Sequence, residues 1–286
     1  MPKIAIVTDS TAYLPSETYA KLPIFTIPLH VIWGDETYKD NVDITADVFY
    51  SKLGSAKIMP STSQPSPQEF VELYQKVAQE YDEILSIHIS AKLSGTVDSA
   101  LQAKKILENK IKVEVVDSRS TSMGLGFLAL TAARKVKAGE SLQATKDFIE
   151  SARDRAKIFF IPKTLEFLKR GGRIGAASAL LGTALDLKPI LMVDEGEVKP
   201  FVKVRTMQKA LAKLVEILQE NIAGKTPVHM AIIQAEAESD AGFLLKEIQY
   251  RLKNADLAEM ISAGISPVIG THAGPGAVGI CFLTEK

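Results

Sequence analysis

The sequence has almost no cysteine and no excess of charge, and both facts exclude classes of protein. Its 286 residues include a single cysteine, Cys281, so no disulfide can form within the chain. That cysteine lies in the apolar run 278–283, which predicts a buried structural thiol. No Cys/His spacing suggests structural zinc. Basic and acidic residues number 34 each, so the chain lacks the general attraction to nucleic acid that a basic protein has.

Several familiar patterns are absent as well. The chain has neither the phosphate-binding motif GxxxxGK[ST] nor the nucleophile elbow GxSxG. No apolar run reaches the roughly 20 residues that a membrane-spanning helix needs. The chain begins on a strand pattern without the apolar core of a signal peptide, so the cytoplasm is the expected compartment. We expect no metal and no cofactor.

The first half of the chain alternates short β-branched runs with helical patterns. Apolar runs at 3–7, 84–89 and 113–116 each lead into a hydroxyl-rich loop and then a helical pattern. Such repeats predict parallel strands with helices on both faces of the sheet. One helix is marked by a capping box, with Ser66 before Pro67 and Glu69 three residues on. Residues 1–160 are therefore predicted to form a three-layer α/β/α domain with a mainly parallel sheet.

The second half has a different pattern. Runs at 190–194 and 198–204 flank Glu195-Gly196, which predicts a hairpin with a tight turn. The remaining predicted elements are strands at 157–161, 228–233 and 277–283 and helices at 165–169, 207–221 and 241–252. A hairpin among helices indicates a mixed sheet. We predict a two-domain α/β protein whose second domain, residues 161–286, is α/β with a mixed sheet.

Hydroxyl side chains follow the predicted parallel strands. Ligands of open α/β sheets bind at the carboxyl ends of the strands, where helix N-termini favour anions. The hydroxyls are Thr8, Ser10 and Thr11; Ser61, Thr62 and Ser63; Ser90, Ser94 and Thr96; and Ser118, Ser120, Thr121 and Ser122. Helix capping alone could explain each set. However, residues 61–63 precede the capping residue Ser66, and Gly95 allows backbone to approach a ligand closely.

The kind of anion follows from the shortage of cations in these loops. Lys92 and Arg119 are the only basic residues there, and no Walker lysine is present. A site of hydroxyls and amides with little fixed positive charge suits a small monoanion such as a carboxylate better than a nucleotide. The residues alone do not identify the acid.

Two glycine-containing segments in the second half carry further candidates. Residues 270–279 hold His272 before the last strand, where it either donates to a ligand or belongs to a tight turn. Residues 168–175 end a short helix, and capping explains Gly171 but not the second glycine or Arg173. An arginine beyond the cap is suited to a phosphate or an acidic partner surface.

The chain resembles the DegV family, whose characterised members are fatty-acid-binding subunits (FakB type) of bacterial fatty acid kinase. Six segments carry the resemblance, in order and over the whole chain. They are Val7-Thr8-Asp9-Ser10, Thr62-Ser63-Gln64-Pro65-Ser66-Pro67, Ile89-Ser90-Ala91-Lys92-Leu93-Ser94-Gly95-Thr96, Val116-Asp117-Ser118, Leu168-Lys169-Arg170-Gly171-Gly172-Arg173-Ile174 and Gly270-Thr271-His272-Ala273-Gly274-Pro275-Gly276.

The resemblance implies a lipid between the two domains and specific residues around it. It implies that Thr62 and Ser94 hold the carboxylate and that His272 lies near the same head group. Beside them, Gly95 and Thr271 are expected at the carboxylate site. The resemblance also implies contact with the kinase or a phosphate at Arg170. Arg205 falls in a further segment that resembles the family, Val202-Lys203-Val204-Arg205-Thr206, and we add Arg173 to the same group.

The function expected from the resemblance is binding rather than catalysis. The chain is expected to hold a long-chain fatty acid and present its carboxylate to a separate ATP-dependent fatty acid kinase, which forms an acyl-phosphate. The alternative is a stand-alone metal-dependent phosphotransferase that uses Asp9 or Asp117. A DNA-associated regulator is a third reading, against which the zero net charge argues. Acyl chain length, tail pocket and oligomeric state are not predicted.

Overall fold

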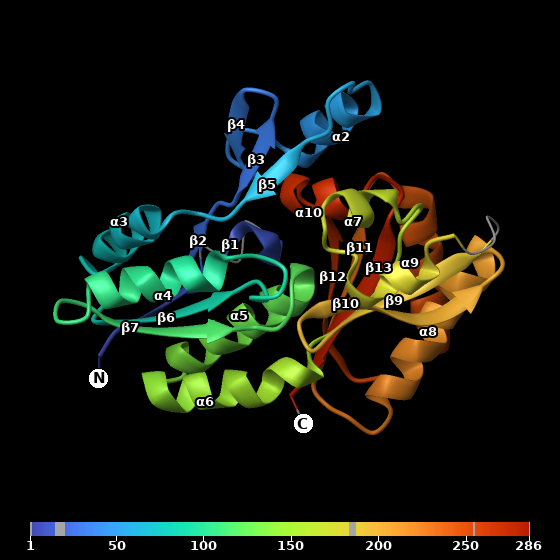
Figure 1. Ribbon diagram of the computed structural model, residues 1–286. Coiled ribbons are helices and arrows are strands. Elements are labelled where there is room, and N and C mark those ends of the chain that lie inside the picture. Colours follow the sequence, from blue (N-terminus) through green and yellow to red (C-terminus); the bar gives the residue numbers. More distant parts are fainter. Residues whose placement is uncertain (1, 15–20, 183–186, 254, 286) are drawn as a thin grey trace.

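The computed structural model describes residues 2–14, 21–182, 187–253 and 255–285. Two α/β units lie side by side, and a small sheet with one helix projects above the place where they meet (Figure 1). No helix in the described part of the chain is long and apolar enough to cross a membrane.

The first unit is a parallel sheet covered by helices on both faces. Its strand order is β2-β1-β6-β7, and every pairing is parallel. The strands are β1 (Ile4–Asp9), β2 (Ile24–Ile27), β6 (Glu83–His88) and β7 (Lys112–Asp117). Helices α3 (Pro67–Val77) and α4 (Thr96–Ile106) cover one face, and α5 (Ser122–Lys137) and α6 (Leu142–Ala152) cover the other. The predicted three-layer arrangement is confirmed.

The capping box predicted before α3 is present. The Glu69 amide donates to Ser66 Oγ at 3.2 Å, and the Ser66 amide donates to Glu69 Oε2 at 2.8 Å. Pro67 begins the helix, where its missing N–H costs no hydrogen bond. The segment 61–66 is therefore fixed at its helical end.

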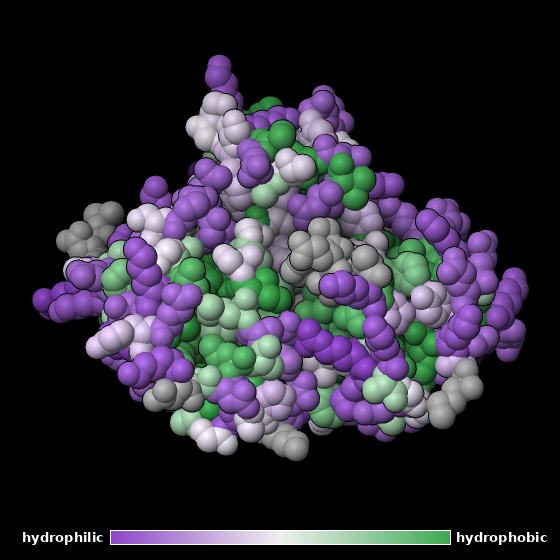
Figure 2. All heavy atoms as spheres, turned by 180° about the vertical axis from the view of Figure 1, so that it is seen from behind, coloured by the Kyte–Doolittle hydropathy of each residue, from purple (hydrophilic) through white to green (hydrophobic). Residues whose placement is uncertain are grey.

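A small antiparallel sheet was not predicted. It joins β3 (His30–Trp33) to β4 (Glu36–Lys39) and to β5 (Ser61–Ser63), and helix α2 (Ala46–Gly54) packs beside it. Thr62 of β5 pairs with Val31 of β3. Apolar side chains remain exposed on this projecting part, including Val42 and Ile58, and Figure 2 shows it from behind. The strand β5 carries the surplus hydroxyls to the junction of the two units.

The second unit contains a mixed sheet, as predicted, but the sheet has six strands, because a strand at 257–264 was not predicted. Its order is β10-β9-β8-β13-β11-β12, with only β11 and β12 parallel. The strands are β8 (Lys157–Ile161), β9 (Lys188–Asp194), β10 (Glu197–Val204), β11 (Val228–Gln234), β12 (Leu257–Gly264) and β13 (Val278–Thr284). Helices α8 (Met207–Ile222) and α9 (Glu238–Arg251) pack on one face, and α5 packs against β11 and β13 on the other.

The hairpin predicted in this unit is confirmed. Glu195 and Gly196 connect β9 to β10, with φ of 50° and 84°. Two consecutive positive φ angles are typical of the tight turn whose twist matches the flanking strands. Glycine adopts this conformation without the steric cost that a side chain brings.

The predicted boundary between the two domains, after residue 160, falls within β8. Because Lys157–Ile161 pairs with β9 and β13, we propose that the second unit begins at Lys157. The two units share one apolar core, in which α5 lies between the two large sheets. Cys281 of β13 is fully buried in this core, as predicted.

The remaining short elements are η1 (Ser10–Ala12), η2 (Arg153–Arg155), α7 (Glu166–Arg170), η3 (Gly175–Leu180) and α10 (Pro267–Ala273).

Candidate functional site

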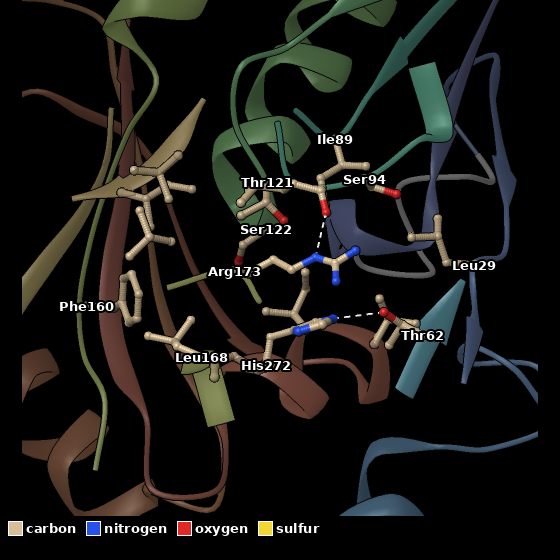
Figure 3. Close-up of a pocket in the computed structure, with 18 of the residues that line it drawn as sticks. Leu29, Thr62, Ile89, Ser94, Thr121, Ser122, Phe160, Leu168, Arg173 and His272 are labelled. Carbon is tan, nitrogen blue, oxygen red and sulfur yellow. Dashed lines mark hydrogen bonds between the residues drawn. The ribbon is translucent and has the colours of Figure 1, made fainter. Parts of the chain in front are cut away.

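A cavity lies where the two units and the small sheet meet (Figure 3). It encloses about 830 Å³ of atom-free space, including the open space at its mouth. Its apolar lining is Leu29, Ile89, Leu93, Ile158, Phe160, Leu168, Val193, Val198, Ile233, Ile265, Val268, Ile269 and Ala273. Its polar lining is Thr62, Ser63, Gln64, Ser94, Thr121, Ser122, Arg173 and His272. The cavity thus combines a long apolar wall with a few polar groups.

Helix α10 places His272 in this cavity, against Thr62. No helix was predicted at 270–273, where a ligand-binding segment and a tight turn were both left open, but these residues complete a helix that ends at Ala273. Asp40 holds the start of that helix, because it accepts hydrogen bonds from the Val268 amide at 3.2 Å and the Ser266 hydroxyl at 3.0 Å. His272 Nε2 lies 2.8 Å from Thr62 Oγ1. Two predicted residues 210 positions apart are therefore in direct contact.

The imidazole of His272 is uncharged near neutral pH. Burial, together with a smaller effect of the positive charge of Arg173, lowers the pKa of His272 to about 4. Its Nδ1 is buried without a hydrogen-bond partner among the described residues. A neutral ring of this kind can orient a hydroxyl group, but it cannot attract a carboxylate by charge.

This depressed pKa predicts an acid-sensitive contribution to stability. The unfolded chain protonates His272 near pH 6.5, whereas the folded chain resists protonation down to about pH 4. The contribution is therefore complete above about pH 6.5 and is lost as the pH falls toward 4. Between these limits we expect wild type to lose roughly 3 kcal/mol more free energy of unfolding than His272→Gln. Urea unfolding at several pH values measures this, and parallel curves for the two proteins would contradict it.

Arg173, whose expected contact with a phosphate or a partner stays a prediction, lines the cavity. Its Nε donates to the Leu93 carbonyl at 3.1 Å and its Nη1 to the Gly171 carbonyl at 2.6 Å. In Figure 3 the guanidinium lies between the side chains of Ile89 and His272. Two backbone carbonyls thus hold a permanent positive charge over the polar part of the cavity.

The two glycines before Arg173 have the opposite roles from those expected. Gly171 was expected to supply a left-handed cap, but its φ is −72°, and Gly172 has the left-handed φ of 70°. The Arg173 amide donates to the Leu168 carbonyl and the Gly172 amide to the Lys169 carbonyl, which is the Schellman pattern. Gly171 instead lies against the ring of His272, where a Cβ atom would overlap Nδ1.

The other predicted residues divide between the cavity and its surroundings. Ser94 lines the cavity, and its hydroxyl lies 2.9 Å from that of Thr96. Gly95 is not in the lining, although a Cβ there would lie 2.9 Å from Gln64 Nε2. The Thr271 hydroxyl faces its own helix and donates to the Pro267 carbonyl at 2.9 Å.

The other two arginines predicted to contact a partner, Arg170 and Arg205, are exposed and outside the cavity lining. Arg170 forms an ion pair with Glu166 one helical turn away, at 2.7 Å. Arg205 follows β10 directly. Their positions leave both available to a partner, and neither contacts the cavity.

The hydroxyls after β1 serve the interior of the first unit and do not line the cavity. Ser10 donates to Asp40 at 2.7 Å, and Thr11 donates to Asp9 at 2.6 Å. Only the three later sets therefore contribute to the cavity lining, through Thr62, Ser94 and Thr121 among others.

The two aspartates of the phosphotransferase alternative are engaged in backbone hydrogen bonds. Asp9 is fully buried, accepts from the amides of Thr11 and Ile89, and lies 3.1 Å from His88 Nδ1. Asp117 accepts from the Arg119 amide at 2.8 Å. In the described part of the chain, no group of three or more His, Cys, Asp or Glu side chains is arranged to hold a metal ion.

Residues 274–279 have the spacing GxGxxG, which in other proteins binds dinucleotides. That fingerprint follows a strand and opens a helix. Here Gly274 ends α10 and the segment runs into β13, which is the reverse order. The spacing therefore does not indicate a nucleotide site.

The sequence did not distinguish the residues of the apolar wall from ordinary core. Phe159 and Phe160 are neighbours on β8, yet Phe160 lines the cavity and Phe159 packs in the core beneath α8. Alternation along a strand predicts that adjacent side chains face opposite ways. Which of the two faces borders a cavity depends on how the units pack together.

Comparison with known proteins identifies relatives over the full chain. Residues 3–285 match the family described as "Uncharacterised protein, DegV family". Protein DegV of Bacillus subtilis is 37% identical over 98% of both chains, and a DegV domain-containing protein of Deinococcus radiodurans is 39% identical over 98% of both.

Solved structures give the same picture of the fold. A DegV family protein from Thermus thermophilus, described for its fatty acid binding, has a TM-score of 0.92 and 34% identity over 99% of both chains. DegV from Bacillus subtilis, described as a fatty acid binding protein, has a TM-score of 0.91 and 36% identity over 99% of this chain and 100% of that one.

Proposed function

The chain belongs to the DegV family, and we propose that it binds a long-chain fatty acid in the cavity between its two units. The observation that carries the proposal is the composition of the cavity. Its polar side chains include Thr62, Ser94, Arg173 and His272, and most of the remaining lining is aliphatic or aromatic. A fatty acid has the same two parts, a carboxylate and an apolar chain. The fatty acid binding described for structural relatives supports the same reading.

The carboxylate is held by donors that His272 and Arg173 arrange. With a proton on Nε2, the neutral ring donates to Thr62 Oγ1, so the Thr62 hydroxyl proton is free to point at the ligand. Ser94 adds a second hydroxyl. The guanidinium of Arg173 supplies the positive charge that the neutral histidine lacks. A charge-assisted hydrogen bond of this kind contributes roughly 1.5–3 kcal/mol.

The acyl chain provides most of the binding free energy. Burial of a 16-carbon chain offers on the order of 11 kcal/mol, at ~0.8 kcal/mol for each methylene group. The wall that receives it comes from both units, with Ile89 from the first and Ile158, Phe160 and Val193 from the second. The tail therefore supplies most of the affinity, while the head group contributes a smaller part and fixes the orientation of the ligand.

The bound carboxylate is the group that a partner acts on. In this proposal a separate ATP-dependent fatty acid kinase phosphorylates the carboxylate to an acyl-phosphate, and the chain itself is not a catalyst. Arg170 and Arg205 are exposed, and we assign them to contact with that kinase or its phosphate. The cytoplasmic location stays a prediction.

Native mass spectrometry of the purified chain tests the binding proposal. We expect a fatty acid to remain bound after purification, or to bind one to one when an 18-carbon acid is added to delipidated protein. Absence of any fatty acid complex would contradict the proposal. Turnover of ATP by the chain alone would instead favour the phosphotransferase alternative.

A further inference from the structure

The cavity wall contains a buried hydroxyl group with no partner. Thr121 lines the cavity and is only 8% exposed, yet its Oγ1 makes no hydrogen bond within the described part of the chain. Its neighbour Ser122 is 2% exposed, and its Oγ likewise has no oxygen or nitrogen partner there. Leaving a buried hydroxyl unpaired costs free energy, and valine would fill the same space without that cost.

Helix capping does not use the Thr121 hydroxyl. Thr121 is the residue before α5 and has the extended backbone of an N-cap, with φ of −154°, but its side chain accepts no cap hydrogen bond. The buried thiol of Cys281 lies near the amides of Met123 and Gly124 and near the Ser122 hydroxyl, and these groups partly offset the rise in the thiol pKa that burial causes. The Thr121 hydroxyl is not among these groups, and its residue lines the cavity.

The surroundings of this hydroxyl favour an oxygen atom on a ligand. The start of α5, a helix of 16 residues, carries a partial positive charge that stabilises oxygen lone pairs. In Figure 3, Thr121 and Ser122 lie on one side of the Arg173 side chain, and Thr62 and His272 lie on the other. The Thr121 position is therefore a second polar point in the wall, separate from the Thr62–His272 pair.

We propose that the Thr121 hydroxyl forms a subsite for an oxygen substituent on the acyl chain, so that hydroxylated fatty acids are a ligand class of this protein. The inference rests on the proposed function, because it needs an acyl chain in the cavity. The Thr121 hydroxyl both donates and accepts, so it can pair with an acyl hydroxyl in either direction. An unsubstituted chain leaves this hydroxyl unpaired.

The test compares 18-carbon acids that carry a hydroxyl at different positions with the unsubstituted acid. Isothermal titration gives the dissociation constant of each for wild type and for Thr121→Val, which keeps the side-chain shape. For the isomer whose hydroxyl reaches Thr121, we expect Thr121→Val to shift the preference toward the unsubstituted acid roughly tenfold, as loss of one buried hydrogen bond implies.

Thr131 provides a matched control on the same helix. It is 2% exposed, and its hydroxyl is also unpaired within the described residues, but it does not line the cavity. Thr131→Val should leave the ratio of the two affinities as in wild type. An unchanged ratio in Thr121→Val for every isomer overturns the subsite. Failure of wild type to bind the unsubstituted acid contradicts the proposed function instead.

Discussion

Replacement of Arg173 by methionine is expected to weaken fatty acid binding by roughly 10- to 100-fold, the loss of one charge-assisted hydrogen bond. Methionine keeps much of the length of the side chain but removes the only positive charge in the described cavity lining. His272 does not compensate, because burial keeps its pKa near 4 and its ring neutral. Titration of an 18-carbon acid measures the loss directly.

Lys169 is the control for this substitution. It is an exposed residue of α7, the short helix that ends just before Arg173, so Lys169→Met removes one positive charge four positions away without changing the cavity lining. We expect its affinity to match that of wild type. Equal affinities for Arg173→Met and wild type would show that the charge does not hold the ligand. Because Arg173 also binds two backbone carbonyls, thermal unfolding of both variants shows whether either change acts through the fold.

Gly171→Ala is expected to have the second large effect, through the position of His272. The added Cβ would overlap Nδ1 of the imidazole and lie 2.8 Å from Cε1. The imidazole cannot move away freely, because its Nε2 is hydrogen-bonded to Thr62. Helix α10, which carries His272, is also packed at the junction of the two units. Overpacking of this kind costs roughly 1–3 kcal/mol of stability, and displacement of His272 should weaken fatty acid binding at least about tenfold.

The adjacent glycine separates this effect from backbone strain. A Cβ on Gly172 would meet no atom within 4 Å, but its φ of 70° is unfavourable for alanine. Gly172→Ala should therefore cost roughly 1–2 kcal/mol of stability and leave affinity unchanged. Urea unfolding and ligand titration of both variants test the pair. Wild-type affinity in Gly171→Ala would contradict the proposed role of His272 in holding Thr62.

Local patterns in the sequence predicted most of the two large sheets. The β-loop-α repeats of the first half, the capping box at Ser66 and the hairpin around Glu195-Gly196 all form as expected, because each depends on neighbouring residues. The small sheet was missed because β5 has only three residues and pairs with β3, about 30 positions earlier. Helix α10 was missed because Gly270 and the glycines that follow the helix resemble a turn, whereas the buried carboxylate of Asp40 stabilises its first turn.

The candidate site was predicted where hydroxyls mark strand ends and missed where contacts cross the junction. Thr62, Ser94 and His272 were each singled out from the sequence, and the structure brings all three to one cavity. Arg173 was expected to contact a phosphate or an acidic partner surface. Its place in the cavity lining was not predicted, because nothing in its own turn shows that it reaches the Leu93 carbonyl 80 positions earlier. The need for glycine at 171 arises from a contact with His272, about 100 residues away, which local pattern cannot report.

A crystal structure of the chain with a bound 18-carbon fatty acid tests the central claim most directly. We expect the acyl chain to lie between the two units, along the wall that includes Ile158, Phe160 and Leu168. The carboxylate should be within hydrogen-bond distance of Thr62 Oγ1 and next to Arg173. A carboxylate outside this cavity, or an acyl chain on the outer surface with the cavity filled by water, would contradict the proposed site.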